Sequence, residues 1–482
     1  MQHLRVFPLC RLATDPARLL PADALQRVVR AERPVFLDGA CDADGLGRYS
    51  FAGCNPRARY VLNDVPICRD ESRQIAATHW FGAVEQAHAV RAPAAPIWRR
   101  LQAVIDDWHP WVGVGLLDYE LGRSYERLAE RAAACDVGTP AVDFAAYDAL
   151  YRYDAVRDVA EIVAVDEEAA ERLRCVLRAA PLPLSPLRCG RLRSDLSREQ
   201  HAASVSAVLE RLRAGDCYQV NLCRWLRASM PAESALPAFL RLRDVAPAPL
   251  GAFFRLDGAH EGGETPFVLS NSPELFLQFD WSQGLVETRP IKGTRRRSGD
   301  ARQDAALAAE LLASRKDAAE HVMIVDLLRN DLGRIAHPGS VRVEGFLRGV
   351  RLPTVHHLVS TVKAQPARDI GLAELLHATF PGGSITGAPK IAAMQLIDSL
   401  EPRRRGPFYG ALGWLTRDAG TLALCIRTAV ATRGELVLAV GGGIVLDSNA
   451  ADEWAETEAK AAAFARALGN HDASPQRGRA AG

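Results

Sequence analysis

The stretch LVLAVGGGIVLDSNAADEWAETEAKAAAF, residues 436–464, contains both kinds of element from which the fold is built. The run 436–445 is apolar, as in a buried strand, and its three consecutive glycines let a ligand lie close to the backbone. From residue 449 to 468 the pattern changes to helical spacing. The sequence therefore predicts a strand followed by a helix.

The same two patterns recur on the N-terminal side of this stretch. Further strand-like runs lie at 217–226, 267–271, 285–291 and 422–431, and helical patterns lie at about 303–335 and 388–400. Another helix begins with a capping box formed by Ser197 and Gln200 and ends at Gly215. Apolar and polar residues alternate in CYQVNLCRWL (217–226), which predicts a half-buried strand. Strand pairs joined by long helical excursions predict an α/β fold of the α+β type.

Composition excludes several classes of protein. The 482 residues are 48% hydrophobic and 24% charged with a formal net charge of +1, so no global charge favours nucleic acid or an anionic membrane. The basic run 289–297 is expected to be a solvated loop. The sequence contains no stretch of 18 apolar residues, so no membrane span is predicted. The N-terminus lacks a signal peptide's apolar region. The ten cysteines lack metal-like spacing, which argues against zinc and indicates free thiols in a reducing cytoplasm.

The chain divides into four segments by composition. Residues 1–180 mix short strand-like runs with Gly and Pro breaks and contain no motif of known chemistry. A Pro-rich connector at 181–196 precedes the motif-rich segment 197–468. The polar, Gly/Ala-rich end, 469–482, is predicted to be disordered.

Lysine is rare in this chain. Among 59 Lys and Arg residues only five are lysine: Lys292, Lys316, Lys363, Lys390 and Lys460. Lys292 lies in VETRPIKGTRRR (286–297), where every other cation is arginine. Arginine stays protonated, whereas a desolvated lysine can lose its proton and attack as an amine. Lys292 is therefore a candidate nucleophile, although codon bias explains the arginine surplus itself.

Two helices place carboxylates on apolar or aromatic faces. Glu320 shares a face with Met323, Ile324 and Leu327, so it must be paired, protonated or bound to a cation. Glu453, Glu456 and Lys460 lie on one face of the last helix, together with Phe464. An ion pair with arginine and a solvated salt-bridge stripe are the ordinary explanations. Together the three acids would instead suit a hard cation such as Mg²⁺.

Two further motifs are ambiguous by themselves. PGGSITGAPK (381–390) leads into a helix, with Pro389 at its first position, and its small residues suit either an anion site or a tight turn. His356 and His357 lie in a strand-like run, so one of them is expected to face inward.

Taken in order, the motifs of residues 197–468 resemble the chorismate-utilising enzymes, a family that includes anthranilate, aminodeoxychorismate, isochorismate and salicylate synthases. The resemblance rests on GDCYQVNL, SPELF, TRPIKGT, AEHVMIVDLLRNDLGR, HHLVS, PGGSITGAPK, FYGALGW, CIRTA, GGGIVLDS and EWAETEAKA. It implies one large unit of two packed antiparallel sheets with helices outside. Residues 1–180 would complete that unit.

The residue at position 292 separates the branches of this family. Anthranilate synthases usually carry PIAGT, and the aminodeoxychorismate synthase branch carries PIKGT, as this chain does. The resemblance implies that Lys292 attacks C2 of chorismate while Glu274 of SPELF protonates the departing C4 hydroxyl. Ammonia then adds at C4, giving the precursor of 4-aminobenzoate and folate. The arginines that flank Lys292 are expected to help keep its amine deprotonated. Isochorismate and salicylate synthases place lysine where this chain has Gln219, so water is not the expected nucleophile.

The resemblance also implies a metal site and a substrate site. It assigns Glu320 and Glu456 to Mg²⁺, with Glu453 nearby and acting through water. Positions that match substrate contacts are Gln219, His357, Thr386, Tyr409, Arg427, Gly441, Gly442, Gly443 and Lys460.

Two features of the family are missing from the sequence. Many relatives bind tryptophan through a Leu-Leu-Glu-Ser-like motif, but VFLDGACDADG (35–45) lacks that serine, so a tryptophan site is not expected. No glutaminase signature is present, so ammonia is expected from solution or from a separate glutamine amidotransferase subunit. Three alternatives remain: anthranilate synthesis, isochorismate or salicylate synthesis, and a non-catalytic partner built on the same fold.

Overall fold

The computed structural model describes residues 5–8, 19–41, 45–63, 65, 95–126, 128, 135–256 and 265–469. The predicted disordered end therefore lies outside the described residues, apart from Gly469. Within these ranges, none of the helices is both long and apolar enough to cross a bilayer. The eight cysteines that they contain are free thiols.

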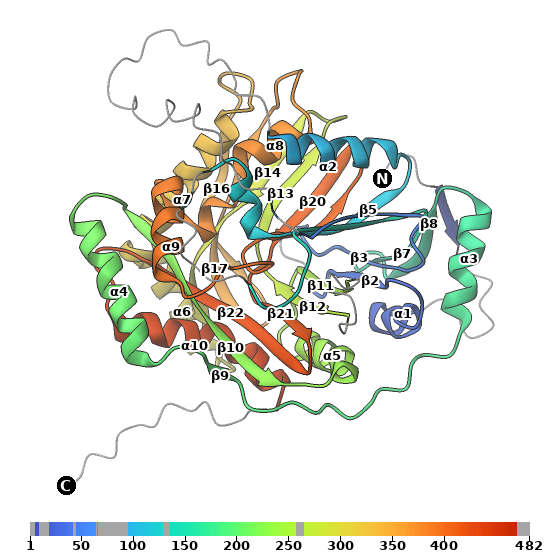
Figure 1. Cartoon of the computed structure of the whole chain (residues 1–482), viewed down its shortest axis with the longest axis horizontal. Helices are drawn as coiled ribbons and strands as arrows, with labels where there is room; N and C mark the ends of the chain where they lie inside the picture. The colour runs from blue at the N-terminus through green and yellow to red at the C-terminus, as the bar shows by residue number, and fades with distance from the viewer. Residues whose placement is uncertain are drawn as a thin grey trace.

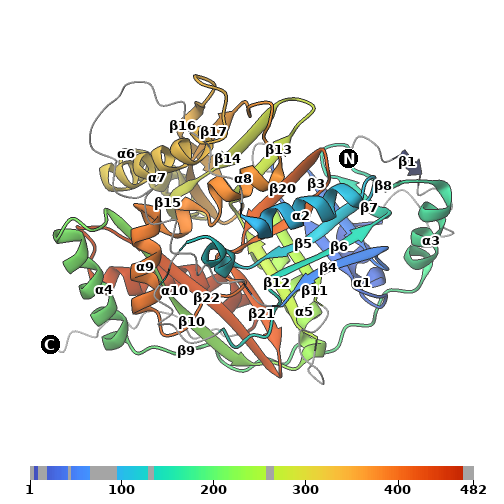
Figure 2. The same ribbon diagram turned by 45° about the horizontal axis from the view of Figure 1, so that its top comes forward.

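Two large antiparallel sheets form the centre of the molecule, with helices around them (Figures 1 and 2), so the predicted α/β fold is confirmed. In spatial order, the first sheet contains β1 (Arg5–Pro8), β8 (Val159–Ala164), β7 (Ala149–Asp154), β3 (Tyr49–Gly53), β2 (Val35–Asp38), β11 (Leu250–Arg255), β12 (Phe267–Ser272), β21 (Thr428–Thr432), β22 (Glu435–Ile444), β10 (Gln219–Ser229) and β18 (Gly387–Ala388), with β9 (Arg193–Ser194) beside β10. The second contains β15 (Ile291–Arg296), β17 (Val355–Ala364), β14 (Leu285–Arg289), β13 (Leu275–Asp280), β20 (Ala419–Leu424), β19 (Ala411–Leu415), β5 (Val112–Leu117), β6 (Val142–Tyr147) and β4 (Ala58–Leu62), with β16 (Arg342–Arg351) beside β17.

Helices cover the outer faces of both sheets. They are α1 (Pro21–Val28), α2 (Pro96–Asp107), α3 (Glu167–Arg178), α4 (Arg198–Arg213), α5 (Ala235–Val245), α6 (Ala301–Ala313), α7 (Arg315–Gly333), α8 (Leu372–Thr379), α9 (Lys390–Leu400) and α10 (Ala450–Ala467). Short 3₁₀ helices lie at η3 (Tyr119–Ser124), η4 (Ala232–Ser234) and η5 (Gly383–Ile385).

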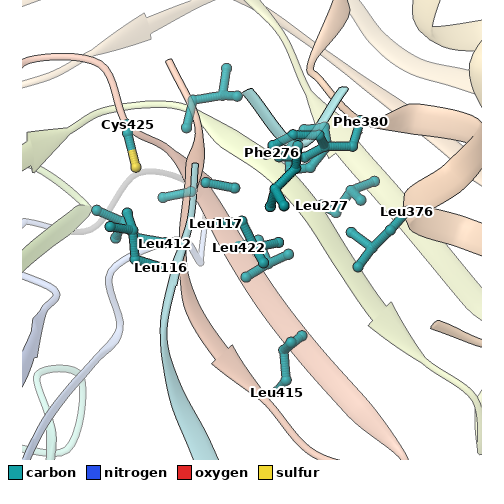
Figure 3. Close-up of a cluster of buried hydrophobic side chains, with 14 of the residues drawn as sticks. Leu116, Leu117, Phe276, Leu277, Leu376, Phe380, Leu412, Leu415, Leu422 and Cys425 are labelled. Carbon is teal, nitrogen blue, oxygen red and sulfur yellow. The ribbon is translucent and has the colours of Figure 1, made fainter. Parts of the chain in front are cut away.

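The largest hydrophobic core lies between the two sheets and also includes side chains of α2, α7 and α8, which cover the second sheet. It combines side chains such as Phe254 and Val430 from the first sheet with Leu116 and Leu422 from the second. Figure 3 shows the part of this core formed by β5, β13, β19, β20 and α8. A second core lies on the other face of the first sheet, under α1, α3, α5 and α10.

The first 180 residues contribute strands to both sheets. β2 pairs with β11 in the first sheet, and β5 pairs with β19 in the second. The N-terminal segment and the motif-rich segment are therefore hydrogen-bonded to each other through two separate ladders. Between them, residues 179–192 contain no helix or strand.

The predicted capping box was confirmed, and two other helix boundaries differ from the prediction. The Ser197–Gln200 capping box opens α4, with each side chain bonded to the other's backbone N–H. The helical pattern at 303–335 contains two helices instead of one, because Ser314 ends α6 and caps α7 by accepting from the Asp317 N–H. Pro389 is the N-cap of α9, one residue before the predicted position.

Three of the strand predictions needed correction. β10 is buried on both faces from Gln219 to Leu226, so the predicted half-buried strand is wrong. The run 285–291 is two strands, divided at Pro290, which has no N–H to donate. The run 422–431 is also two strands, because β20 belongs to the second sheet and β21 to the first.

Candidate active site

Two adjacent crossings from one sheet to the other place the first functional side chains. β12 and β21 pair in the first sheet, and their continuations β13 and β20 pair in the second. Glu274 lies at one crossing and Arg427 at the other. The crossings are hydrogen-bonded to each other, since Leu424 N–H donates to Glu274 O and Asn271 N–H donates to Arg427 O. The sheet change therefore holds an acid and a cation side by side.

Glu274 is a buried carboxyl group with one specific donor. Its side chain is 6% exposed, and Ser384 Oγ donates to Glu274 Oε1 at 2.7 Å. Burial raises the pKa of Glu274, while the Ser384 hydrogen bond and the charge of Lys292 oppose that rise. A raised pKa favours the protonated form of a carboxyl group, which can act as a general acid.

Lys292 lies on β15, beside α7 (Figure 2), and its side chain is partly covered by protein. Burial lowers the pKa of the amine, and the charge of Lys460 lowers it further against the opposing acids Glu320 and Glu274. A lowered pKa increases the fraction of neutral, nucleophilic amine.

The arginines that follow Lys292 in the sequence have a different role from the one expected. Arg295 pairs with Glu310 and Asp317, and Arg297 pairs with Asp304. These acids neutralise the basic run, so the arginines do not depress the pKa of Lys292, as we had expected. Most of the run also lies in strand β15, so the predicted solvated loop is wrong.

The three glycines of β22 leave space that functional groups occupy. A Cβ atom on Gly442 would lie 2.9 Å from Glu453 Oε2 and 3.5 Å from Glu456 Oε1. A Cβ atom on Gly441 would lie 2.7 Å from the Tyr409 hydroxyl. Any side chain there would displace these groups, so the glycines are required by close approach.

Gly443 lies at the meeting point of two polar side chains. A Cβ atom there would clash with Gln219 Nε2 and lie 3.4 Å from Lys292 Nζ. Both polar atoms of the Gln219 side chain are buried without a hydrogen-bond partner among the described residues. A buried amide without protein partners needs hydrogen bonds from a ligand or from an ordered water.

The three candidate metal ligands influence one another across the gap between α7 and α10. Burial raises the pKa of Glu320 and of Glu453, and the negative charge of Glu456 adds to both increases. Lys460 pairs with Glu456 at 2.7 Å and lowers the pKa of that carboxyl. Ser448 Oγ donates to Glu453 Oε1 at 2.6 Å, while Glu453 Oε2 is buried without a partner.

The oxygen atoms of these carboxylates are suitable ligands for a hard cation, but their positions do not form a metal site. Among the described residues, no three His, Cys, Asp or Glu side chains are close enough together to hold a metal ion. The unpartnered oxygen of Glu453 and the mutual repulsion of the acids favour an added positive charge. Binding would require Glu456 to exchange Lys460 for the cation.

His357 and Thr386 occupy buried positions at the edge of the site. Burial and the charge of Arg427 lower the pKa of His357 to about 3, so the imidazole is neutral. Thr294 lies 2.9 Å from His357 Nδ1, and Nε2 is buried without a partner in the described part of the chain. The Thr386 hydroxyl donates to the carbonyls of Gly382 and Gly383, which shapes the η5 turn.

A small cavity adjoins this region. It is lined by Leu46, Pro273, Arg289, Ile291, Arg348, Val350, Leu352, His357 and Val359. Pro273 and Ile291 directly precede Glu274 and Lys292 in the chain. The cavity therefore reaches the backbone that carries both candidate catalytic groups.

The other lysines divide into one site residue and three structural or surface residues. Lys460 Nζ donates to Gly441 O at 2.6 Å, beside its ion pair with Glu456. Lys390 is bonded to Asp331 and to the Thr379 carbonyl, so it joins α9 to α7 and α8. Lys316 is exposed, and Lys363 is half-buried with a partner, Glu344.

Sequence reasoning missed the residues that support the site. Ser384, Ser448 and Thr294 bond to Glu274, Glu453 and His357 respectively. All three lie within motifs already recognised, PGGSITG, GGGIVLDS and IKGT. Polar residues in those motifs were the available signal.

The chain is similar to known proteins over most of its length. The model of the chorismate binding enzyme family matches residues 48–466. The chain belongs to this family. It is 42% identical over 352 residues to aminodeoxychorismate synthase component 1 of Klebsiella aerogenes, covering 72% of this chain and 75% of the relative. It is also 39% identical over 464 residues to anthranilate synthase component 1 of Thermus thermophilus, covering 93% of this chain and 95% of that relative.

Solved structures agree with the fold. Anthranilate synthase component I from Streptococcus pneumoniae TIGR4 superposes with a TM-score of 0.67 at 27% sequence identity, covering 86% of this chain and 92% of that one. Overall identity is similar for the two kinds of relative.

Proposed function

We propose that this protein is the chorismate-aminating component of an aminodeoxychorismate synthase. The observation that carries the proposal is the pairing of Lys292, whose pKa is lowered, with Glu274, whose pKa is raised. Burial favours the neutral, nucleophilic form of the amine and the protonated form of the acid. Relatives with this name and about 40% identity support the same assignment.

In the proposed reaction, the Lys292 amine forms a bond to C2 of chorismate. The conjugated double bonds shift, the C4–O bond breaks, and Glu274 gives its proton to the departing hydroxyl, which leaves as water. Ammonia then adds at C4, the double bonds shift back, and Lys292 is released. The products are 4-amino-4-deoxychorismate and one water molecule.

The remaining site groups are proposed to bind the substrate carboxylates. Lys460, Arg427 and the Tyr409 hydroxyl lie around the glycine strand and supply cations and a donor. Mg²⁺ held by Glu320, Glu456 and Glu453 would neutralise the ring carboxylate. Ammonia is proposed to come from a separate glutamine amidotransferase subunit, consistent with relatives named component 1.

The test incubates purified protein with chorismate, Mg²⁺ and ammonium and identifies products by mass spectrometry and fluorescence. Aminodeoxychorismate is the expected product. Without ammonia, intact-protein mass spectrometry should find an adduct of chorismate minus water. Lys292→Ala should lose both signals, and Lys363→Ala, which removes a half-buried lysine paired with Glu344, should keep both. Fluorescent anthranilate would assign the chain to the second candidate, anthranilate synthase, and untouched chorismate would refute both.

A further inference from the structure

Arg405, in the segment between α9 and β19, is a buried charge that does not belong to the candidate catalytic, metal-binding or substrate-binding residues. Its side chain is 1% exposed and forms an ion pair with Glu401 through two hydrogen bonds, of 3.0 and 2.7 Å. The same guanidinium donates to the Ile385 carbonyl at 2.8 Å and to the Asn221 carbonyl at 2.6 Å. It therefore binds three separate segments of the chain at once.

The two backbone carbonyls belong to segments that form the substrate end of the site. Ile385 directly precedes Thr386 in the η5 turn. Asn221 pairs with Gly443 in the β10–β22 ladder, and its N–H donates to the Thr386 carbonyl at 2.8 Å. Arg405 thus fixes the η5 turn relative to the glycine strand.

The faces of the guanidinium contact two aromatic rings. Its carbon lies 4.6 Å from the Tyr409 ring centre and 4.8 Å from the Tyr119 ring centre. Tyr409 directs its hydroxyl at Gly441, and it adopts a left-handed backbone conformation with φ of 65°. Stacking on Arg405 fixes the ring whose hydroxyl reaches the glycine strand.

Glu401 connects Arg405 to strand β10. Besides Arg405, its carboxylate accepts from the Cys223 N–H at 3.0 Å, and Cys223 pairs with Gly441. The Arg405 N–H donates to Glu120, which lies in the N-terminal segment. Stability alone does not require a buried ion pair, because a well-packed apolar pair is often as stable. What an apolar pair lacks is a planar set of donors directed at several segments.

We propose that the Arg405–Glu401 pair positions the η5 turn, the glycine strand and Tyr409 so that they bind the substrate carboxylate in one geometry. The pair touches no reacting atom, so it is a positioning device. This inference rests on the proposed function, because chorismate is the substrate whose binding is measured.

The test uses the double variant Glu401→Gln/Arg405→Met, which removes both charges and keeps an acceptor for the Cys223 N–H. The KM for chorismate should rise about 10- to 100-fold, the range expected when binding groups move by about 1 Å. The KM for ammonia and kcat at saturating chorismate should stay within about threefold. The matched control is Arg33→Met/Asp143→Asn, another buried ion pair, which should leave the KM for chorismate unchanged.

Arg405→Lys is the second variant. It keeps the charge, and hence a partner for Glu401, but loses the planar fork, so the same rise in KM is expected. A folded double variant or lysine variant with a KM within twofold of wild type would refute the positioning role. If the double variant does not fold, Arg405→Lys decides by itself. If the wild-type protein does not convert chorismate, the proposed function fails instead, and the two failures are thus distinguishable.

Discussion

Replacing Glu274 by glutamine tests the proposed acid most directly. Glutamine has nearly the same shape, keeps an oxygen for the Ser384 hydroxyl, and carries no proton that it can transfer. A positioned general acid contributes about 10²- to 10⁴-fold to a rate. At 1.36 kcal/mol for each factor of ten, Glu274→Gln should raise the activation barrier by about 3–5 kcal/mol.

Although Glu274→Gln should lower the activity, it should not lower the stability at high pH. The pKa of Glu274 in the folded protein is raised by burial above its ordinary value. Its contribution to stability is therefore present at low pH and is lost as the pH rises through the folded pKa. Glutamine cannot ionise, so the variant does not lose this contribution. At pH 8 its melting temperature should equal or exceed that of the wild-type protein.

The assay measures kcat/KM for chorismate with ammonia between pH 6 and 9, with thermal unfolding of the same samples. The wild-type protein should lose activity as the pH rises through the raised pKa of Glu274, and the variant should not show this loss. Activity within fivefold of wild type would refute the assignment of Glu274 as the acid. A fall in both activity and melting temperature would show a structural role instead.

Two further predictions concern the proposed cation and the least exposed ion-paired lysine. Glu453→Gln should raise the Mg²⁺ concentration for half-maximal activity about 10- to 100-fold, measured by Mg²⁺ titration, because it weakens a ligand or a residue that orients one. Glu210→Gln on the exposed side of α4 is the control, and an unchanged Mg²⁺ requirement in Glu453→Gln would contradict the site. Lys390→Met leaves Asp331 buried without its cation and should lower the free energy of unfolding by about 3–5 kcal/mol in urea. Exposed Lys316→Met should change it by less than about 0.5 kcal/mol, and an equal effect of both substitutions would show that the Lys390 pair is not structural.

Features with local causes could be predicted from the sequence. The capping box of α4 depends on Ser197 and Gln200, which are three residues apart, and it forms as expected. The choice of Lys292 as a nucleophile depends on the chemistry of an amine among guanidinium groups, which needs no fold. The shared face of Glu453, Glu456 and Lys460 follows from helical spacing, and the last two form an ion pair one turn apart.

Features that depend on packing between distant segments could not be predicted. β10 was expected to alternate between buried and exposed residues, but both of its faces are covered. The arginines after Lys292 were expected to depress its pKa, but acids from α6 and α7 neutralise them. Glu310 and Asp317 lie 15 and 22 residues from Arg295, and only the packing of their helices against β15 brings them together.

By itself, the sequence therefore determined which groups are available for the chemistry: an amine, a carboxylic acid, three further carboxylates and a glycine strand. Only the tertiary structure decided their protonation and their neighbours. The chain crosses between sheets at Glu274 and Arg427, which buries the acid and places a cation beside it. Desolvation and charge act through space, so the pKa of each group depends on segments that are far away in the sequence.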